Sequence, residues 1–168
     1  MLTAERLIKL LNLKPHPEGG YYAETYRSKE LIAMEALPDR YSGPRSYGTA
    51  IYYLLTPQTF SAIHRLATDE IYHFYLGDPV ELIRLEPDGS GRLIVLGDDV
   101  AGGMQVQAVI SRGTWQGARL FEGGKYALLG TTVAPSFEFV DFEAGRRSDL
   151  ILAYPSFRDI VIALTRED

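Results

Sequence analysis

The sequence predicts a mainly β fold, an antiparallel sandwich or barrel, with short helices at both ends of the chain. From Tyr47 to Phe142 the apolar runs are short, and Gly, Pro or Asp turns separate nearly all of them. Outside this region the apolar residues follow helical spacing instead. The 168 residues are enough for one well-buried core, so we expect a single domain over residues 1–168.

Four segments are expected before the β region. An amphipathic helix is predicted over residues 3–13, because apolar residues recur there at helical spacing and no Gly or Pro interrupts them. Prolines and glycines at residues 15–20 then break the chain sharply. Residues 21–28 alternate as a strand does. Residues 31–45 predict a long loop, and loops of that length in compact domains are often lids or edge covers.

The β region predicts a succession of short strands. In addition to a central pair at residues 60–77, strands are expected at residues 49–55, 80–85, 92–96, 105–110, 115–121, 126–133 and 137–142. Two helices follow at residues 146–154 and 157–165, separated by Pro155, which cannot continue a helix.

The central pair, residues 60–77, is the stretch from which we expect the functional site. Two apolar and aromatic runs flank a short polar break, a pattern that predicts a β-hairpin. A turn centred on that break places His64 opposite Glu70, with their Cβ atoms about 5 Å apart. Strand alternation puts Tyr72 and Phe74 on the same face. The hairpin therefore predicts a pocket in which an imidazole lies beside a carboxylate, walled by aromatic rings.

The other face of this predicted hairpin carries Ile63, Ile71, His73 and Tyr75. Should it not pack on a second sheet layer, this amphipathic face is the expected contact of a homodimer.

Composition excludes several classes of function. A formal charge of -5 without any Lys/Arg cluster argues against a nucleic-acid surface. The absence of cysteine excludes disulfides, thiol catalysis and thiolate-held metals. No apolar run approaches the roughly 18 residues that a membrane span needs, and the first residues lack the layout of a signal peptide. We therefore expect a cytoplasmic protein whose partner is a small molecule.

Two short motifs resemble those of a known family. His64, Leu66 and Glu70 have the spacing of the first cupin motif, with Leu66 in the place of its second histidine. The segment from Ser111 to Gln116 resembles the second cupin motif, with Ser111 and Gln116 in place of its proline and histidine.

Longer stretches carry the resemblance further, over nearly the whole chain. Residues 15–28, 69–82, 112–120 and 131–145 are similar to the cupin subfamily of uncharacterised proteins called DUF985 or Cupin_5. This resemblance implies a double-stranded β-helix, the jelly-roll or cupin barrel, with a short N-terminal helix and two short C-terminal helices. It also implies a homodimer, the common state in the family.

The resemblance implies only a degenerate metal site. A metal-binding cupin uses two histidines and a glutamate from the first motif and a histidine from the second. Here His64, Glu70 and an amide oxygen of Gln116 remain, fewer than the two-histidine, one-carboxylate set of non-haem iron enzymes. At most a weakly held divalent metal is expected on these three residues.

Acid–base chemistry is the competing interpretation. A carboxylate beside His64 orients the ring and makes it more basic, as proton abstraction requires. Cupin sugar epimerases pair such a histidine with a tyrosine acid, and here Tyr72 or Tyr53 could supply the phenol. The expected catalytic residues are therefore His64, Glu70 and Tyr72.

Six further residues are candidates for binding the ligand. Arg119 could anchor an anionic group, although a surface salt bridge explains it equally well. Trp115 is expected in the core, and His16 in its proline-flanked turn is expected to be structural or a lid contact. The expected ligand-binding residues are Tyr53, Phe74, Gln116, Arg119, Tyr22 and Glu24.

These observations favour a protein that binds a small polar or sugar-like metabolite in the barrel, with isomerisation or epimerisation as its candidate chemistry. Two alternatives stay open: a non-catalytic ligand-binding or structural cupin, and a metal-dependent cupin enzyme of the oxygenase or hydrolase type.

Overall fold

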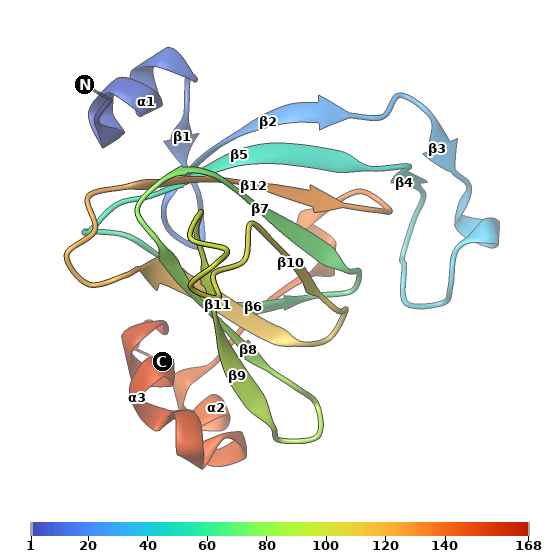
Figure 1. Cartoon of the computed structure of the whole chain (residues 1–168). Helices are drawn as coiled ribbons and strands as arrows, with labels where there is room; N and C mark the ends of the chain where they lie inside the picture. Colours follow the sequence, from blue (N-terminus) through green and yellow to red (C-terminus); the bar gives the residue numbers. More distant parts are fainter. Residues whose placement is uncertain (1, 168) are drawn as a thin grey trace.

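A computed structural model describes residues 2–167; the two end residues of the expected domain, 1 and 168, lie outside the described residues. Two antiparallel sheets pack face to face in a jelly roll, as the sequence predicts (Figure 1). The N-terminal helix lies at one end of the first sheet, and the two C-terminal helices cover the second sheet. No helix in the described part of the chain is long and apolar enough to cross a membrane.

The first sheet has six strands. Their spatial order is β1 (Lys14–Pro15), β2 (Tyr21–Arg27), β5 (Thr49–Leu55), β12 (Ala127–Val133), β7 (Glu70–Gly77) and β10 (Gln107–Ile110). Alternate residues of β5, β7 and β12 point inward, where Tyr53, Tyr72 and Leu129 are each at most 2% exposed. At one end, helix α1 (Ala4–Leu10) covers the outer face through Leu7 and begins at the N-cap Thr3.

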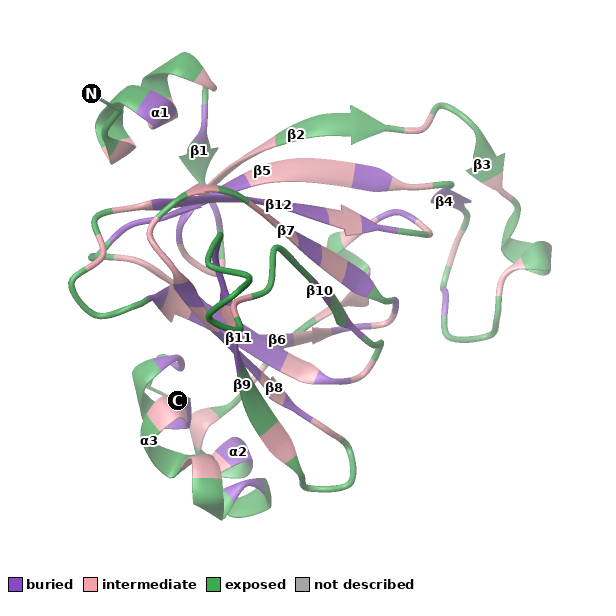
Figure 2. Ribbon diagram, in the orientation of Figure 1, coloured by how far each residue is buried: buried purple, intermediate pink, exposed green. Residues whose placement is uncertain are grey.

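The second sheet has five strands. Their order is β13 (Phe142–Ala144), β6 (Phe60–Leu66), β11 (Trp115–Leu120), β8 (Val80–Leu85) and β9 (Gly91–Leu96). Its outer face is closed by α2 (Arg147–Ala153), the 3₁₀ turn η3 (Pro155–Phe157) and α3 (Arg158–Ala163). The backbone N–H of Ile63 donates to the carbonyl of Leu164 over 2.8 Å, so this helical layer is also hydrogen-bonded to the sheet. Figure 2 shows the resulting buried layer between the sheets and the exposed outer surfaces.

The predicted central hairpin is wrong. β6 lies in the second sheet, between β11 and β13, whereas β7 lies in the first, between β10 and β12. The polar break crosses from one sheet to the other, because its polar groups bond to other segments: Thr68 Oγ1 donates to the Ala134 carbonyl and Asp69 accepts from the Arg112 amide. Ile63 and Tyr75 therefore lie on the outer faces of different sheets.

The predicted strand at residues 137–142 is also wrong. This segment forms the 3₁₀ turn η2 (Phe139–Asp141), and pairing begins only at Phe142 in β13. Side-chain contacts hold it instead of a strand ladder. The Asp141 carboxylate accepts two hydrogen bonds from Arg45, and Thr49 Oγ1 accepts one from the Phe137 amide.

The expected long loop contains some regular structure. Short strands β3 (Leu31–Ile32) and β4 (Arg45–Ser46) pair with each other, and the 3₁₀ turn η1 (Met34–Ala36) lies between them. Together they form an arm that projects beside the barrel (Figure 1). The buried end of the arm is Arg45, which is 3% exposed and reaches η2.

Candidate functional site

A small cavity lies between the two sheets, at the end of the barrel nearest the arm. Its volume is about 110 Å³, and its walls come from β2, β5, β6, β7, β12 and the turn at residues 15–20. Phe137, Glu138 and Phe139 form part of its wall from the segment that leads into and through η2. The polar groups that line it are His16, Glu18, Glu24, Arg27, Thr49, His64, Glu70, Thr131 and Glu138, with Tyr22 beside them.

His64 is the buried centre of this site. It lies in the middle of the second sheet, where its Cα is the partner of Gln116 on β11 and of Ala144 on β13. Only 2% of the residue is exposed. Its ring stacks on Phe142, with centroids 5.1 Å apart and planes 23° apart, and its Nδ1 lies 2.8 Å from the Ala62 carbonyl oxygen. These contacts fix the ring so that Nε2 faces Glu70.

Glu18 is the nearest carboxylate to this imidazole. Its Oε2 lies 2.6 Å from His64 Nδ1. The same Nδ1 lies 2.8 Å from the Ala62 carbonyl oxygen, so both oxygens compete for its one N–H, and the protonated ring forms an ion pair with Glu18. Burial, the largest single influence, would raise the pKa of Glu18, but the attraction and hydrogen bonding of His64, together with His16 and Ser61, lower it overall.

The turn that carries Glu18 is fixed against the barrel. Gly19 and Gly20 have φ of 116° and 72°, a region that favours glycine. The Tyr53 hydroxyl donates to the Gly19 carbonyl over 2.7 Å, and the Ala62 amide donates to the Glu18 carbonyl over 3.0 Å. The turn is thereby tied to both sheets, which places the carboxylate beside the ring.

Glu70 approaches His64 from the opposite sheet. Its Oε2 accepts a hydrogen bond from Gln116 Nε2 at 2.8 Å and lies 3.9 Å from His64 Nε2. The second distance is too long for a hydrogen bond, so the Nε2–H can donate to a ligand. The expected proximity of His64 and Glu70 is thus present, but it arises across the two sheets and not across a hairpin.

The two carboxylates keep His64 protonated. Burial lowers the pKa of the imidazole, but Glu18 and then Glu70 more than offset this and raise it to about 10. His64 is therefore an imidazolium at neutral pH. In that state it can donate a proton or a hydrogen bond, whereas the acid–base interpretation assigns it the role of the base.

His16 is the neutral counterpart of His64. Burial lowers the pKa of His16. The attraction of Glu18 opposes this effect, whereas the repulsion of His64 adds to it. Its Nδ1 accepts a hydrogen bond from the Glu18 amide at 3.3 Å, and its ring edge meets Tyr22 at a centroid distance of 4.6 Å. The residue lines the cavity, so it is more than a structural turn residue.

The residues present do not fit a divalent metal. Leu66 offers no ligand, and Gln116 turns its amide nitrogen toward Glu70 while its Oε1 is buried without a partner among the described residues. His64 Nδ1 is engaged by the Ala62 carbonyl and the Glu18 carboxylate. Across residues 2–167 no three His, Asp or Glu side chains are placed to hold a metal ion.

The other sequence-predicted residues divide into two groups. Tyr22 and Glu24 line the cavity, and Gln116 reaches it indirectly through Glu70. The remainder lie elsewhere. Tyr53 and Tyr72 are buried in the core behind the cavity. The pKa of each phenol is raised well above its ordinary value, mainly by burial and to a smaller extent by the nearby carboxylates.

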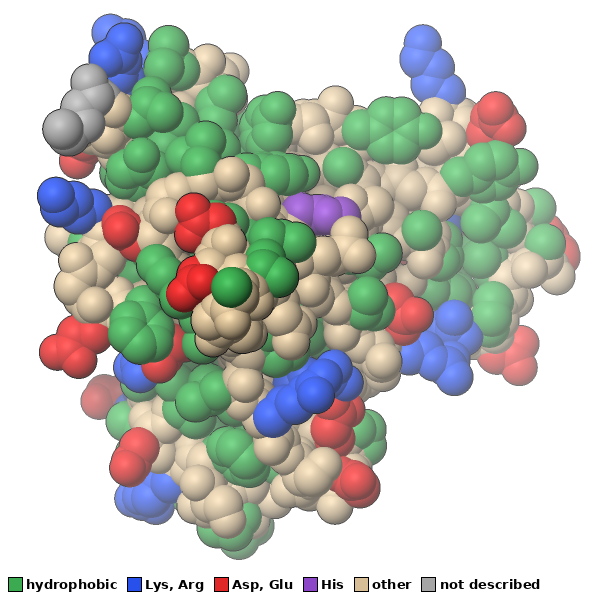
Figure 3. Space-filling model, in the orientation of Figure 1, with side chains coloured by type: hydrophobic (Ala, Val, Ile, Leu, Met, Phe, Trp, Pro, Cys, Tyr) green, Lys and Arg blue, Asp and Glu red, His purple; other side chains and the backbone are tan. Residues whose placement is uncertain are grey.

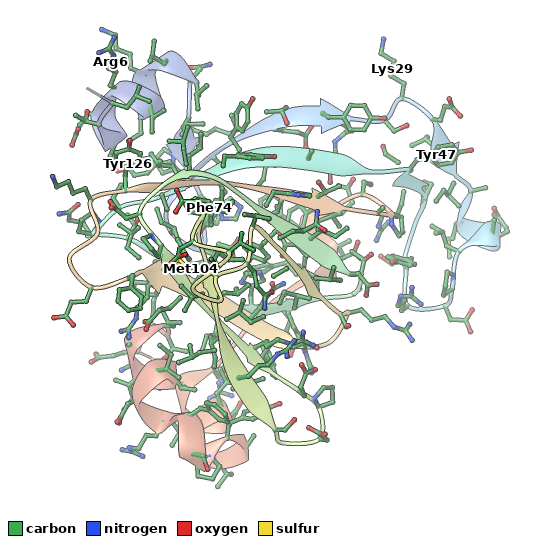
Figure 4. All side chains as sticks on the ribbon, in the orientation of Figure 1. Arg6, Lys29, Tyr47, Phe74, Met104 and Tyr126 are labelled. Carbon is green, nitrogen blue, oxygen red and sulfur yellow. The ribbon has the colours of Figure 1, made fainter. Side chains whose placement is uncertain are left out.

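Phe74 and Arg119 are also away from the cavity. Phe74 packs on the core toward the other end of β7, where Figure 4 shows it near Met104. Arg119 forms an ion pair with Glu81 at 2.7 Å, which matches the surface salt bridge alternative. Trp115 packs between the second sheet and the C-terminal helices.

Sequence reasoning missed three charged residues of the site: Glu18, Arg27 and Glu138. Arg27 donates to Glu24 and to Glu138 and so closes the mouth of the cavity with a chain of ion pairs. The one available signal for Glu18 was its position, since a His-Pro-Glu run between a proline and two glycines combines titratable groups with a rigid turn.

Two sheets that enclose a small polar cavity, with the first-motif histidine at its centre, define a cupin. The family model described as the cupin superfamily (DUF985) matches residues 5–145, so the chain belongs to that family.

Three relatives resemble this chain over most of its length. An uncharacterised protein of Saccharomyces cerevisiae is 29% identical over 147 residues, which is 83% of this chain and 73% of the yeast protein. A hypothetical protein from Leishmania major is 31% identical with a TM-score of 0.88, covering 99% of this chain and 100% of that one. A Shewanella oneidensis protein is 33% identical with a TM-score of 0.87, and the match covers 100% of both chains.

Proposed function

We propose that this protein binds a small polar, sugar-like metabolite in the cavity between the sheets. The observation that carries the proposal is the buried His64, a cation whose Nε2–H faces the cavity and lies 3.9 Å from the nearest carboxylate oxygen. Glu18 and Glu70 compensate the charge, but the Glu70 oxygen is too far from Nε2 to accept its hydrogen bond. A ligand oxygen in the cavity can accept that bond, which is strong because the donor is charged.

The charges of the site favour a neutral or cationic ligand over an anion. Four carboxylates line the cavity, on Glu18, Glu24, Glu70 and Glu138. Two cations, His64 and Arg27, oppose them, while His16 is held neutral. A neutral polyhydroxyl compound suits this mixture, because its oxygens can accept from His64 and its hydroxyls can donate to the carboxylates.

The size of the cavity limits the ligand. Its volume of about 110 Å³ is below the ~300–1,000 Å³ of typical ligand pockets. A fragment of a few heavy atoms fits inside, and a larger sugar-like molecule would extend past the ion pairs of Arg27 at the mouth.

Isomerisation or epimerisation is the second candidate. The observation that favours it is the juxtaposition of the His64 cation and the Glu70 carboxylate, because paired groups of opposite protonation state supply an acid and a base. In such a reaction His64 would donate a proton to the substrate and Glu70 would accept a proton from it. Tyr72 takes no part, since it is 2% exposed and does not line the cavity.

The experiment is a ligand screen by thermal shift, with sugars, polyols, amines and small acids tested in parallel. We expect stabilisation by a neutral or cationic compound, weakened at least tenfold in affinity by Glu70→Gln. Arg119→Gln is the matched control, because its ion pair lies outside the cavity. Stabilisation that Glu70→Gln leaves unchanged would overturn the assignment of the cavity. Incubation of each binder with the protein, followed by product analysis, then separates binding from turnover.

We further propose that the protein is a homodimer that pairs through the outer face of the first sheet. Helix α1 covers only one end of this face. In the uncovered part, strands β7 and β10 present Ile71, His73, Tyr75 and Val109, of which Tyr75 and Val109 are about half exposed. No outward-facing residue of β5, β7, β10 or β12 is Asp, Glu, Lys or Arg. A second copy can therefore stack on this face without like-charge repulsion. Figure 3 shows hydrophobic side chains and a histidine gathered over this part of the surface.

A further inference from the structure

A second hollow lies on the other side of the segment that walls the cavity. It is an open groove of about 490 Å³, formed by the end of β6, the turn between β10 and β11, residues 140–143 and the arm. Leu66 lines both the cavity and the groove. The chemistry of the groove is the opposite of that of the cavity, because three arginines line it: Arg40, Arg65 and Arg112.

The acidic residues of the groove do not balance these arginines. Glu143 accepts two hydrogen bonds from Arg65. The charge of Asp141 is neutralised by Arg45, which does not line the groove; the side chains of this ion pair are at most 4% exposed. Neither carboxylate contacts Arg40 or Arg112 among the described ion pairs and hydrogen bonds of residues 2–167. The lining residues thus carry one positive charge in excess, in a chain whose formal charge is -5, and the Asp69 carboxylate that accepts from the Arg112 amide lies outside the lining.

Arg112 and Arg40 are the groups available to a ligand. The guanidinium of Arg112 has no ion pair or hydrogen bond to any other described residue. Arg40 uses its Nε to donate to the Ala67 carbonyl at 2.9 Å, which orients its two terminal nitrogens without occupying them. Arg40 also lies over the Tyr41 ring, 4.7 Å from its centroid, so its position is constrained.

The backbone beneath these arginines is fixed. The Arg112 amide donates to Asp69 at 2.8 Å, and the Gly113 amide donates to the Leu66 carbonyl at 2.9 Å. Arg65 lies over the Trp115 ring, 4.5 Å from its centroid. Preorganised guanidinium groups lose less conformational entropy when an anion binds.

We propose that this groove is a second binding site, which takes an oxyanion with at least two negative charges, of the phosphate or polycarboxylate class. Guanidinium groups bind such oxyanions by paired, charge-assisted hydrogen bonds. One anion can bridge Arg40 and Arg112 while Arg65 remains paired with Glu143. The site is separate from the cavity, which is acidic and favours a neutral or cationic ligand.

The test is titration calorimetry of the full chain with pyrophosphate and, separately, citrate. We expect saturable binding that weakens as salt is raised. Arg112→Gln should weaken it at least tenfold, and the double variant Arg40→Gln with Arg112→Gln should abolish it. Arg119→Gln, which removes a guanidinium outside the groove, should leave it unchanged. All three positions are at the surface or partly exposed, so circular dichroism should confirm that each variant folds.

The outcomes separate the sources of the anion. Binding of pyrophosphate alone supports the site and assigns it to phosphoryl groups, whereas binding of both probes supports a general polyanion site. Equal loss of binding in Arg119→Gln and Arg112→Gln would show a diffuse charge effect and overturn the proposal, as would no binding of either probe. Glu70→Gln should leave anion binding intact, so failure of the cavity proposal and failure of this one are distinguishable.

Discussion

His64 Nδ1 lies 2.6 Å from Glu18 Oε2, and this buried ion pair joins the turn before β2 to the middle of β6. The ion pair adds to the two hydrogen bonds that hold this turn, which its Glu18 and Gly19 carbonyls accept from the Ala62 amide and the Tyr53 hydroxyl. It also explains the charge state of the site. Without Glu18, burial would favour a neutral ring at His64; with it, the ring is a cation that faces a cavity.

The first prediction concerns the pKa of His64. In the wild type a histidine NMR titration should give a pKa of about 10, well above the ordinary 6.5. Glu18→Gln should lower it by more than one unit, because the nearest opposite charge is removed. Glu143→Gln, which breaks an exposed pair with Arg65, should leave it unchanged. A wild-type pKa near 6.5 would contradict this prediction, because it would show that the carboxylates do no more than offset burial and that His64 is mostly neutral at pH 7.

The second prediction concerns stability. Removing one partner of a buried ion pair costs about 3–5 kcal/mol, whereas an exposed pair contributes about 0–1 kcal/mol. Glu18→Gln should therefore lower the free energy of unfolding at neutral pH several times more than Glu143→Gln. Because the folded-state pKa of His64 is raised, the stability from its protonation is fully present below pH 6.5 and is lost as the pH rises through about 10.

Urea denaturation of both proteins from pH 6 to pH 10.5 checks this dependence. The gap in unfolding free energy between wild type and Glu18→Gln should narrow as the pH rises. A gap that stays constant over this range would mean that the charge of His64 is not what Glu18 stabilises.

The β elements could be predicted well because each depends on local patterning. β5 matches the predicted strand at Thr49–Leu55, and the N-terminal and C-terminal helices are confirmed with slightly shorter bounds. Strand partners were not predictable in the same way. Both β6 and β7 are apolar on both faces, so their sequences fit a hairpin as well as two separate sheets.

The site was predictable where it coincides with a short motif or, as for Tyr22 and Glu24, with a strand of recognisable alternation. His64 and Glu70 lie together as expected, but Glu18 and Glu138 come from segments distant in sequence, and no local periodicity relates them to β6. Segment 137–142 was mistaken for a strand because its aromatic residues alternate. Its actual conformation depends on contacts with Arg27, Arg45 and Thr49 that only the tertiary fold supplies.

The third prediction tests the turn that positions Glu18. A Cβ at Gly19, where φ is 116°, would clash with the backbone carbonyl oxygen of Phe60. Gly19→Ala should therefore destabilise the protein by about 2–4 kcal/mol, which combines left-handed strain with a steric clash. Gly123→Ala is the control, because its φ of 81° is similarly left-handed but a Cβ there meets nothing within 4 Å. Equal thermal unfolding temperatures for the two variants would contradict the packing of this turn.

The fourth prediction concerns the proposed homodimer. A charge on the outer face of the first sheet should separate the two copies, since it would be buried without a partner. Tyr75→Asp and Val109→Asp should each convert a dimer to a monomer in light scattering coupled to gel filtration. Leu93→Asp is the matched control, because Leu93 is 51% exposed on the second sheet. A monomeric wild type, or a dimer that all three variants retain, would exclude this interface.

The fifth prediction concerns the segment that walls the cavity. Asp141 accepts hydrogen bonds of 2.8 and 2.7 Å from Arg45, and both side chains are almost fully buried. Asp141→Asn keeps the shape of the side chain but leaves the Arg45 guanidinium without its counter-charge. If the change affects global unfolding, it should lower the free energy of unfolding by about 3–5 kcal/mol. Because the pair joins the arm to η2, we expect the effect to concentrate there. Hydrogen exchange should accelerate at residues 137–142 more than in β5 or β12, and any cavity ligand should bind more weakly.

Glu143→Gln separates this local effect from a general loss of charge on the same segment. Its pair with Arg65 is exposed, with side-chain exposures of 40% and 55%, so its removal should leave exchange at residues 137–142 nearly unchanged. Uniform acceleration across both sheets in Asp141→Asn would show that the pair stabilises the barrel as a whole. Acceleration confined to the segment would show that Arg45 and Asp141 hold the wall of the cavity in place.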